Sequence, residues 1–201
     1  MKETMRMWLF ASALILGVAS MVSCGNKTAK KAQTETSAQS DVVVEEKATC
    51  STAIEDYLVN EFGKEYSQGD VCIPYAYVIT SDDSNPDDIL VWGDFWVFNY
   101  GVSGDTLKTV SGGDHPGLMH LKKTENGYEV TSFDAVADGA ENLPSAQRIF
   151  GDNYDAFAEF IGDSEKRESL RMRATAEYLK KHNMAATMVQ DFGWPAVALP
   201  K

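Results

Sequence analysis

The 201-residue chain has few of the side chains on which most recognisable enzyme chemistry depends. It contains only three histidines and three cysteines. Its sequence has no His-Glu-x-x-His pair, no Gly-x-Ser-x-Gly turn and no Walker-type phosphate loop, which removes the common zinc-protease, serine-hydrolase and nucleotide-binding hypotheses. Basic residues are scarce too, because 18 Lys and Arg stand against 30 Asp and Glu, for a formal net charge of -12. Nucleic acids are bound largely through Lys and Arg, so we expect no nucleic-acid partner.

The longest apolar run lies near the N-terminus, over residues 7–18, and is too short to span a bilayer permanently. A short charged stretch precedes it and small residues follow it, which is the order of an exported precursor. Residues 21–24, Met-Val-Ser-Cys, resemble the lipobox of bacterial lipoproteins. The resemblance implies that residues 1–23 are a lipoprotein signal peptide and that Cys24 is lipidated. An ordinary secretory peptide with an incidental cysteine is the alternative.

Residues 24–47 form the next distinct segment, rich in Lys, Thr, Ser, Gln, Ala and Glu and without any aromatic residue. Such a composition predicts a flexible tether. Cleavage before Cys24 removes two basic residues and one acidic residue, which changes the net charge from -12 to -13. The acyl chains, and not the surface charge, would therefore hold the protein to a membrane. Residues 25–27 lack the Asp of an inner-membrane retention signal, so we expect the outer membrane of a Gram-negative-type cell envelope, facing the periplasm.

Residues 48–201 are long enough for one α+β domain with a core of its own. A helix is expected from Thr52, which forms a capping box with Glu55, to Gly63. A change to strand periodicity then predicts an antiparallel sheet of about five strands, over residues 71–80, 89–100, 106–111, 118–124 and 128–133. Three more helices are expected over residues 145–150, 154–161 and 164–182.

The strand over residues 89–100 is apolar on both faces, which predicts a helical cover on each side. A helix followed by a curved antiparallel sheet resembles the cystatin-like and NTF2-like superfamily, and residues 127–133, Gly-Tyr-Glu-Val-Thr-Ser-Phe, resemble a late strand of small exported domains in that group. The extra C-terminal helices depart from the pattern. The resemblance implies a fold more than a function, because the superfamily includes isomerases, dehydratases, transport factors and plain binding modules.

Asp94 is the strongest candidate for chemistry because it alternates with Trp92 and Trp96, which places a carboxylate on the same strand face as two indoles. In an NTF2-like enzyme, an Asp in such a place serves as general base, and burial would raise its pKa toward a useful value. Alternatively, Asp94 caps a backbone group or pairs with an Arg or Lys.

Residues 111–117, Ser-Gly-Gly-Asp-His-Pro-Gly, are the most unusual segment. They predict either a bulged connection that bends the sheet or a rim loop in which Asp114 and His115 contact a ligand. His120 lies an odd number of residues from His115, so one strand would point them to opposite faces, and we expect neither a metal site nor a cofactor. Cys50 and Cys72 could form a disulfide in an oxidising compartment, although a helix of about 12 residues would separate them by roughly 18 Å.

These observations favour a membrane-anchored envelope lipoprotein that acts as a non-catalytic module for a ligand or a protein. The first alternative is a small NTF2-like isomerase, dehydratase or hydrolase that uses Asp94. The second is a structural subunit of an envelope complex, for which Trp194-Pro195 would be a docking strand.

Overall fold

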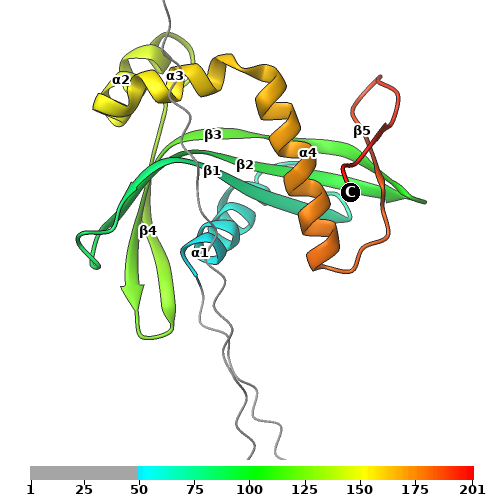
Figure 1. The fold of residues 1–201 in the computed structure, drawn as a ribbon, viewed down its shortest axis with the longest axis horizontal. Coiled ribbons are helices and arrows are strands. Elements are labelled where there is room, and N and C mark those ends of the chain that lie inside the picture. Colours follow the sequence, from blue (N-terminus) through cyan, green and yellow to red (C-terminus); the bar gives the residue numbers. More distant parts are fainter. Residues whose placement is uncertain (1–48) are drawn as a thin grey trace, which may run out of the picture. The chain divides into compact units, whose positions relative to one another are not determined.

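A computed structural model describes residues 49–201, so the predictions for residues 1–48, which include the signal peptide, Cys24 and the tether, lie outside the described residues. The described part is α+β (Figure 1). Its first helix, α1 (Cys50–Tyr57), continues as a π-helical stretch, Leu58–Gly63. Thr49 is the N-cap in place of the expected Thr52, because its hydroxyl oxygen accepts a hydrogen bond from the Thr52 amide at 3.2 Å.

Four long strands follow as a meander: β1 (Val71–Asp82), β2 (Ile89–Ser103), β3 (Thr106–Thr124) and β4 (Gly127–Ala135). The helices α2 (Asn142–Phe150), α3 (Tyr154–Gly162) and α4 (Ser164–Lys181) come next, and two short strands, β5 (Met188–Gln190) and β6 (Val197–Ala198), end the chain. The strand order is β1-β2-β3-β5-β6, with β4 also paired to β3, and the β3–β5 pair is parallel. The sheet is therefore open, mixed and six-stranded, which corrects the expected antiparallel sheet of about five strands.

The single long strand β3 replaces the two strands and the connection expected over residues 106–124. The glycines serve close packing and do not form a turn. Gly112 has a φ of 147°, and a Cβ there would collide with the Val97 carbonyl oxygen on β2. A Cβ at Gly117 would likewise collide with the Asp134 carbonyl oxygen on β4. Glycine thus lets β2 and β4 approach β3 from its two sides.

Apolar side chains pack on both faces of β2, since α1 lies on one side of the sheet and α3 and α4 lie on the other (Figure 1). On one face, Ile54 and Leu58 pack with Phe95 and neighbouring side chains of β2 and β3. On the other face, Trp96 packs with Phe160 of α3 and Leu170 of α4. No helix within residues 49–201 combines the length and the apolar character needed to cross a bilayer.

Candidate functional site

Asp94 lies in the middle of β2 and is fully buried. The two tryptophans on either side of it contact different helices. The Trp92 indole donates a hydrogen bond to the Ile149 carbonyl of α2 at 2.8 Å, and the Trp96 ring stacks with that of Phe160 of α3. The alternation of the strand therefore places the carboxylate between two indoles that helices cover.

Arg167 of α4 is the ionic partner of Asp94. Its Nη2 donates to Oδ2 of Asp94 at 3.1 Å and to Oδ2 of Asp114, on β3, at 2.6 Å. The guanidinium carbon also lies 5.7 Å from the centre of the Trp96 ring. One cation thus joins a buried carboxylate to a half-exposed one. Asp94 pairs with an arginine, which was the alternative to the general base in the sequence analysis.

The pKa of Asp94 rises from 3.8 to about 6. Burial is the largest cause, because it disfavours the charged form. The Trp96 indole opposes the rise, the Asp114 carboxylate adds to it, and Arg167 opposes it. Oδ1 of Asp94 has no hydrogen-bond partner among the described residues. Asp94 therefore stays ionised at neutral pH at an energetic cost and takes up a proton in mildly acidic solution.

Arg171, one helical turn beyond Arg167, has all five of its N–H donors occupied. Nε and Nη2 donate to the two carboxylate oxygens of Glu168 at 2.9 and 2.8 Å. Nη2 and Nη1 donate to Asp191, just after β5, at 2.7 and 3.4 Å, and Nη1 also donates to the Tyr100 hydroxyl at 3.2 Å. This network attaches the end of β5 to α4 and leaves Arg171 without a donor for an external anion.

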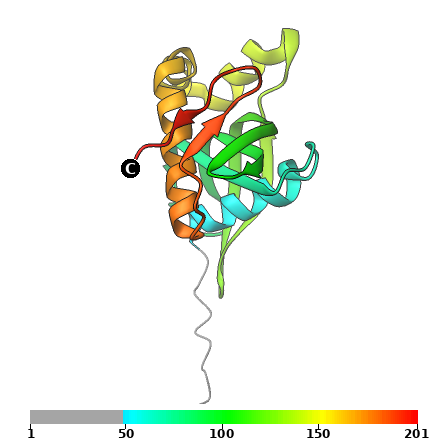
Figure 2. The same cartoon turned by 90° about the vertical axis from the view of Figure 1, so that its right-hand side faces the viewer.

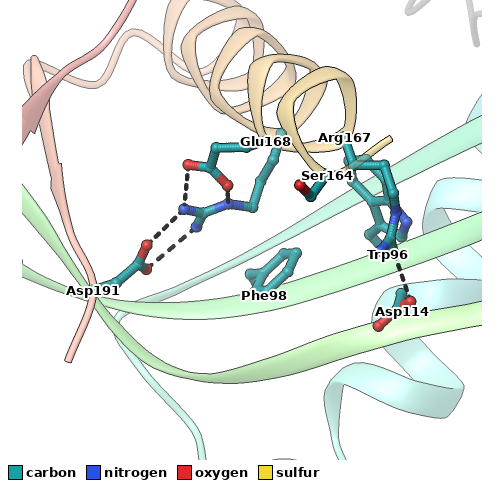
Figure 3. A pocket seen from close by; sticks show the side chains of 8 residues that line it. Trp96, Phe98, Asp114, Ser164, Arg167, Glu168 and Asp191 are labelled. Atoms are coloured by element: carbon teal, nitrogen blue, oxygen red, sulfur yellow. Dashed lines mark hydrogen bonds and ion pairs between the residues drawn. The ribbon is translucent and has the colours of Figure 1, made fainter. Parts of the chain in front are cut away.

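A cavity of about 390 Å³ lies between α4 and the sheet (Figure 3). Figure 3 shows Asp114 and Asp191 at its two ends, with Phe98 between them. The side chains of Asp114, Glu168 and Asp191 are 48%, 55% and 41% exposed, so three carboxylates are open to solvent around an aromatic floor. With Asp94, four carboxylates face two arginines, and the site carries an excess of two negative charges when all are ionised. Its lining consists of Trp96, Phe98, Asp114, Ser164, Arg167, Glu168, Arg171 and Asp191.

The structure brings four of the five predicted ligand-binding residues to this face of the sheet, and His115 is the exception. Because residues 111–117 belong to β3, the prediction of a rim loop is wrong, and His115 points to the opposite face from Asp114. The His115 ring stacks on Phe62, with 4.1 Å between ring centres, and its Nε2 lies 3.2 Å from the Tyr66 hydroxyl. Burial lowers the pKa of His115.

Cys50 and Cys72 are both free thiols, so the structure does not contain the disulfide that the sequence allowed. Cys50 begins α1, whereas Cys72 lies in β1 opposite Asn99 of β2. Burial raises the pKa of both thiols. Within residues 49–201, no group of three His, Cys, Asp or Glu is placed to hold a metal ion.

Sequence reasoning missed the α4 side of the site. Arg167 and Glu168 fall outside the apolar stripe of their helix, which is typical of a solvent-facing position. The signal that could have found Arg167 is Asp94 itself, because a carboxylate in an otherwise apolar strand needs a cation nearby. Asp191 gave no such signal, since it follows a strand of only three residues.

Comparisons of the chain with protein-family models, with curated protein sequences and with solved structures gave no match.

Proposed function

We propose that the protein is a lipoprotein of the bacterial cell envelope, anchored through Cys24, whose domain binds a ligand or partner and does not catalyse a reaction. The burial of Asp94 carries the non-catalytic part of the proposal. A general base must come within hydrogen-bond reach of its substrate. Asp94 has no exposed surface, and the nitrogen of Arg167 that binds it is also bound to Asp114. Asp94 is thus a structural group beneath the cavity.

The domain belongs, in this proposal, to the cystatin-like or NTF2-like group. Support comes from α1, which packs against the long strands β2 and β3, and from residues 127–133, which lie within β4. The helices α2 to α4 and the strands β5 and β6 are additions to that plan. They matter for function because α4 and the residue after β5 supply five of the eight residues that line the cavity.

The charges around the cavity favour a cationic guest. An anion would meet three exposed carboxylates, while the donors of Arg171 are already occupied. An ammonium group would instead find the half-exposed carboxylates of Asp114, Glu168 and Asp191, while the Trp96 and Phe98 rings already face Arg167 and Arg171. The guest class is therefore an organic amine, either a small molecule or a basic side chain of a partner.

Pentane-1,5-diamine and pentanedioate provide a matched pair of probes, with the same carbon chain and opposite charges. We expect the diamine, and not the diacid, to shift the indole N–H resonance of Trp96 in a titration followed by NMR. Asp114→Asn should weaken diamine binding by about three- to fivefold, the effect of one partly screened charge. Asp56→Asn, an exposed position on α1, is the control and should bind like the parent. Equal shifts with both probes, or a shift with the diacid alone, would contradict the cationic guest.

The anchoring part of the proposal has its own test. Cys24→Ala should move the exported protein from the membrane fraction to the soluble fraction, because acyl chains would supply the affinity for the bilayer. Fractionation followed by a carbonate wash measures this. A variant that remains with the membranes after the wash would show that Cys24 is not the anchor.

A second candidate, a subunit of an envelope complex, is favoured by two exposed aromatic residues. Phe192 and Trp194, between β5 and β6, are 72% and 71% exposed. Aromatic side chains of this size are typical centres of protein–protein contacts. Trp194 and Pro195 lie in the connection between β5 and β6, and not in the docking strand expected from the sequence.

A further inference from the structure

A larger cavity, of about 640 Å³, lies beside the C-terminal half of α4 and is separate from the Asp94 site. Residues 184–188 and 198–201 form its other walls. Figure 2 shows this C-terminal segment, coloured orange to red, alongside α4. Eight of the residues that line the cavity are apolar: Ala176, Leu179, Met184, Ala186, Met188, Ala198, Leu199 and Pro200.

Backbone hydrogen bonds hold the walls of this groove in place. The Leu199 amide donates to the Thr187 carbonyl at 2.8 Å, and the Thr187 amide donates to the Asp105 carbonyl at 2.8 Å. The Met184 amide donates to the Leu179 carbonyl at 2.9 Å, which fixes the chain where it leaves α4. The groove is therefore formed before any ligand enters, and its two methionines can adapt to the shape of an aliphatic chain.

The rim of the groove carries a net positive charge, whereas the chain as a whole is negatively charged. Three basic side chains, Arg173, Lys180 and Lys201, stand against one acidic side chain, Glu177, whereas the whole chain has a net charge of -12. Arg173 and Lys180 are exposed, and neither forms an ion pair within residues 49–201. Their charges are available to an external anion.

We propose that this groove binds a single-chain anionic amphiphile. The aliphatic chain would lie on Leu179, Met184 and Leu199, and the anionic head would lie at Arg173 and Lys180. The volume falls within the range of roughly 300–1,000 Å³ that is usual for small-molecule sites lined by apolar side chains with a few polar groups. The positive charge of the rim favours an anionic head group, and the length of the apolar floor favours a particular length of aliphatic tail. This site is independent of the cationic guest proposed for the Asp94 cavity.

Dodecanoate, decanoate and dodecyltrimethylammonium, each below its micelle concentration, are the probes. The experiment uses isothermal titration of the full chain that carries Cys24→Ala, so that no detergent is needed. We expect one dodecanoate per chain, bound roughly tenfold more tightly than decanoate, since each buried methylene is worth up to about fourfold in affinity. Dodecyltrimethylammonium should bind at least tenfold more weakly than dodecanoate, because its head has the wrong charge.

Variants that reverse one charge on the rim, compared with one that reverses a charge elsewhere, test the role of the rim. Arg173→Glu and Lys180→Glu, each at an exposed position, should weaken dodecanoate binding by about tenfold and strengthen binding of the trimethylammonium probe. Lys64→Glu makes the same charge change at an exposed position outside the groove, and it should bind dodecanoate within about twofold of the parent. Equal affinity for the two heads, no gain with chain length, or equal losses in Lys64→Glu and Arg173→Glu would each overturn the proposal.

Discussion

Replacing Arg167 with methionine is expected to lower the free energy of unfolding by about 2 kcal/mol at pH 7. Methionine keeps an apolar stem beside the Trp96 and Phe160 rings, so most of the lost energy comes from the carboxylate left behind. Asp94 is fully buried, and within the described residues Arg167 is the only group with which it forms an ion pair. Without the arginine the pKa of Asp94 rises further, and the buried carboxylate takes up a proton at pH 7; from a pKa of about 6 this costs about 1.4 kcal/mol, to which the lost hydrogen bond adds about 1 kcal/mol.

The cost of Arg167→Met should depend on pH, and this dependence separates the lost charge from lost packing. Once Asp94 is protonated, near pH 4, the buried carboxyl group no longer needs a cation, and only the half-exposed Asp114 loses its ionic partner. The loss should then fall to about 1 kcal/mol, which is typical of one hydrogen bond. Urea unfolding followed by circular dichroism at both pH values measures this. Lys180→Met is the control, because Lys180 is exposed on the same helix, and it should change stability by less than about 0.5 kcal/mol. A loss of equal size at pH 4 and pH 7 would show that Arg167 acts through packing alone.

Asp94→Asn should change how stability responds to pH. In the folded chain the pKa of Asp94 is raised to about 6 from 3.8. Between these values only the folded state holds the proton, so this group contributes stability that is fully present below pH 3.8 and lost as the pH rises through 6. At 1.36 kcal/mol for each pH unit, the contribution is about 3 kcal/mol.

Asparagine does not titrate, so the variant lacks this pH dependence. The difference in unfolding free energy between Asp94→Asn and the parent should therefore shift in favour of the variant by about 2.4 kcal/mol from pH 4 to pH 7, since part of the effect is already lost at pH 4. The other carboxylates titrate alike in the variant and the parent, so their contribution drops out when the two unfolding free energies are subtracted at each pH. Asp56→Asn, an exposed carboxylate on α1, is the matched control and should show no comparable shift. A constant difference for Asp94→Asn would mean that its carboxyl group is solvated in the folded protein.

The α+β class could be predicted because long elements leave clear periodic patterns. The expected helix over residues 164–182 corresponds to α4 (Ser164–Lys181), and the strand over 89–100 corresponds to β2 (Ile89–Ser103). The prediction failed where local sequence and packing disagree. Three glycines and a proline over residues 111–117 are typical of a turn, but here Gly112 and Gly117 make room for the neighbouring strands and Gly113 makes room for Tyr66. The parallel strand β5 has only three residues and shows no alternation that a sequence could reveal.

The candidate site could be predicted only on its β2 side. Alternation along one strand places Trp92, Asp94 and Trp96 on one face, because that relation is local. Arg167 lies 73 residues from Asp94 in sequence, and their pairing depends on how α4 crosses the sheet. The same long-range packing decides that Asp94 lies beneath the cavity and not at its surface. The residue type therefore suggested a general base, and only its burial indicates a structural role.

The affinity of the Asp94→Asn chain for pentane-1,5-diamine is the most direct test of the binding role, measured beside that of Asp114→Asn by the Trp96 indole resonance. Because Arg167 and α4 separate Asp94 from the guest, Asp94→Asn should bind the diamine within about twofold of the parent, while Asp114→Asn should bind about three- to fivefold more weakly. A greater loss in Asp94→Asn than in Asp114→Asn would show that the guest reaches the buried carboxylate. Asp94 would then be placed to act on a bound molecule, which contradicts a purely structural role.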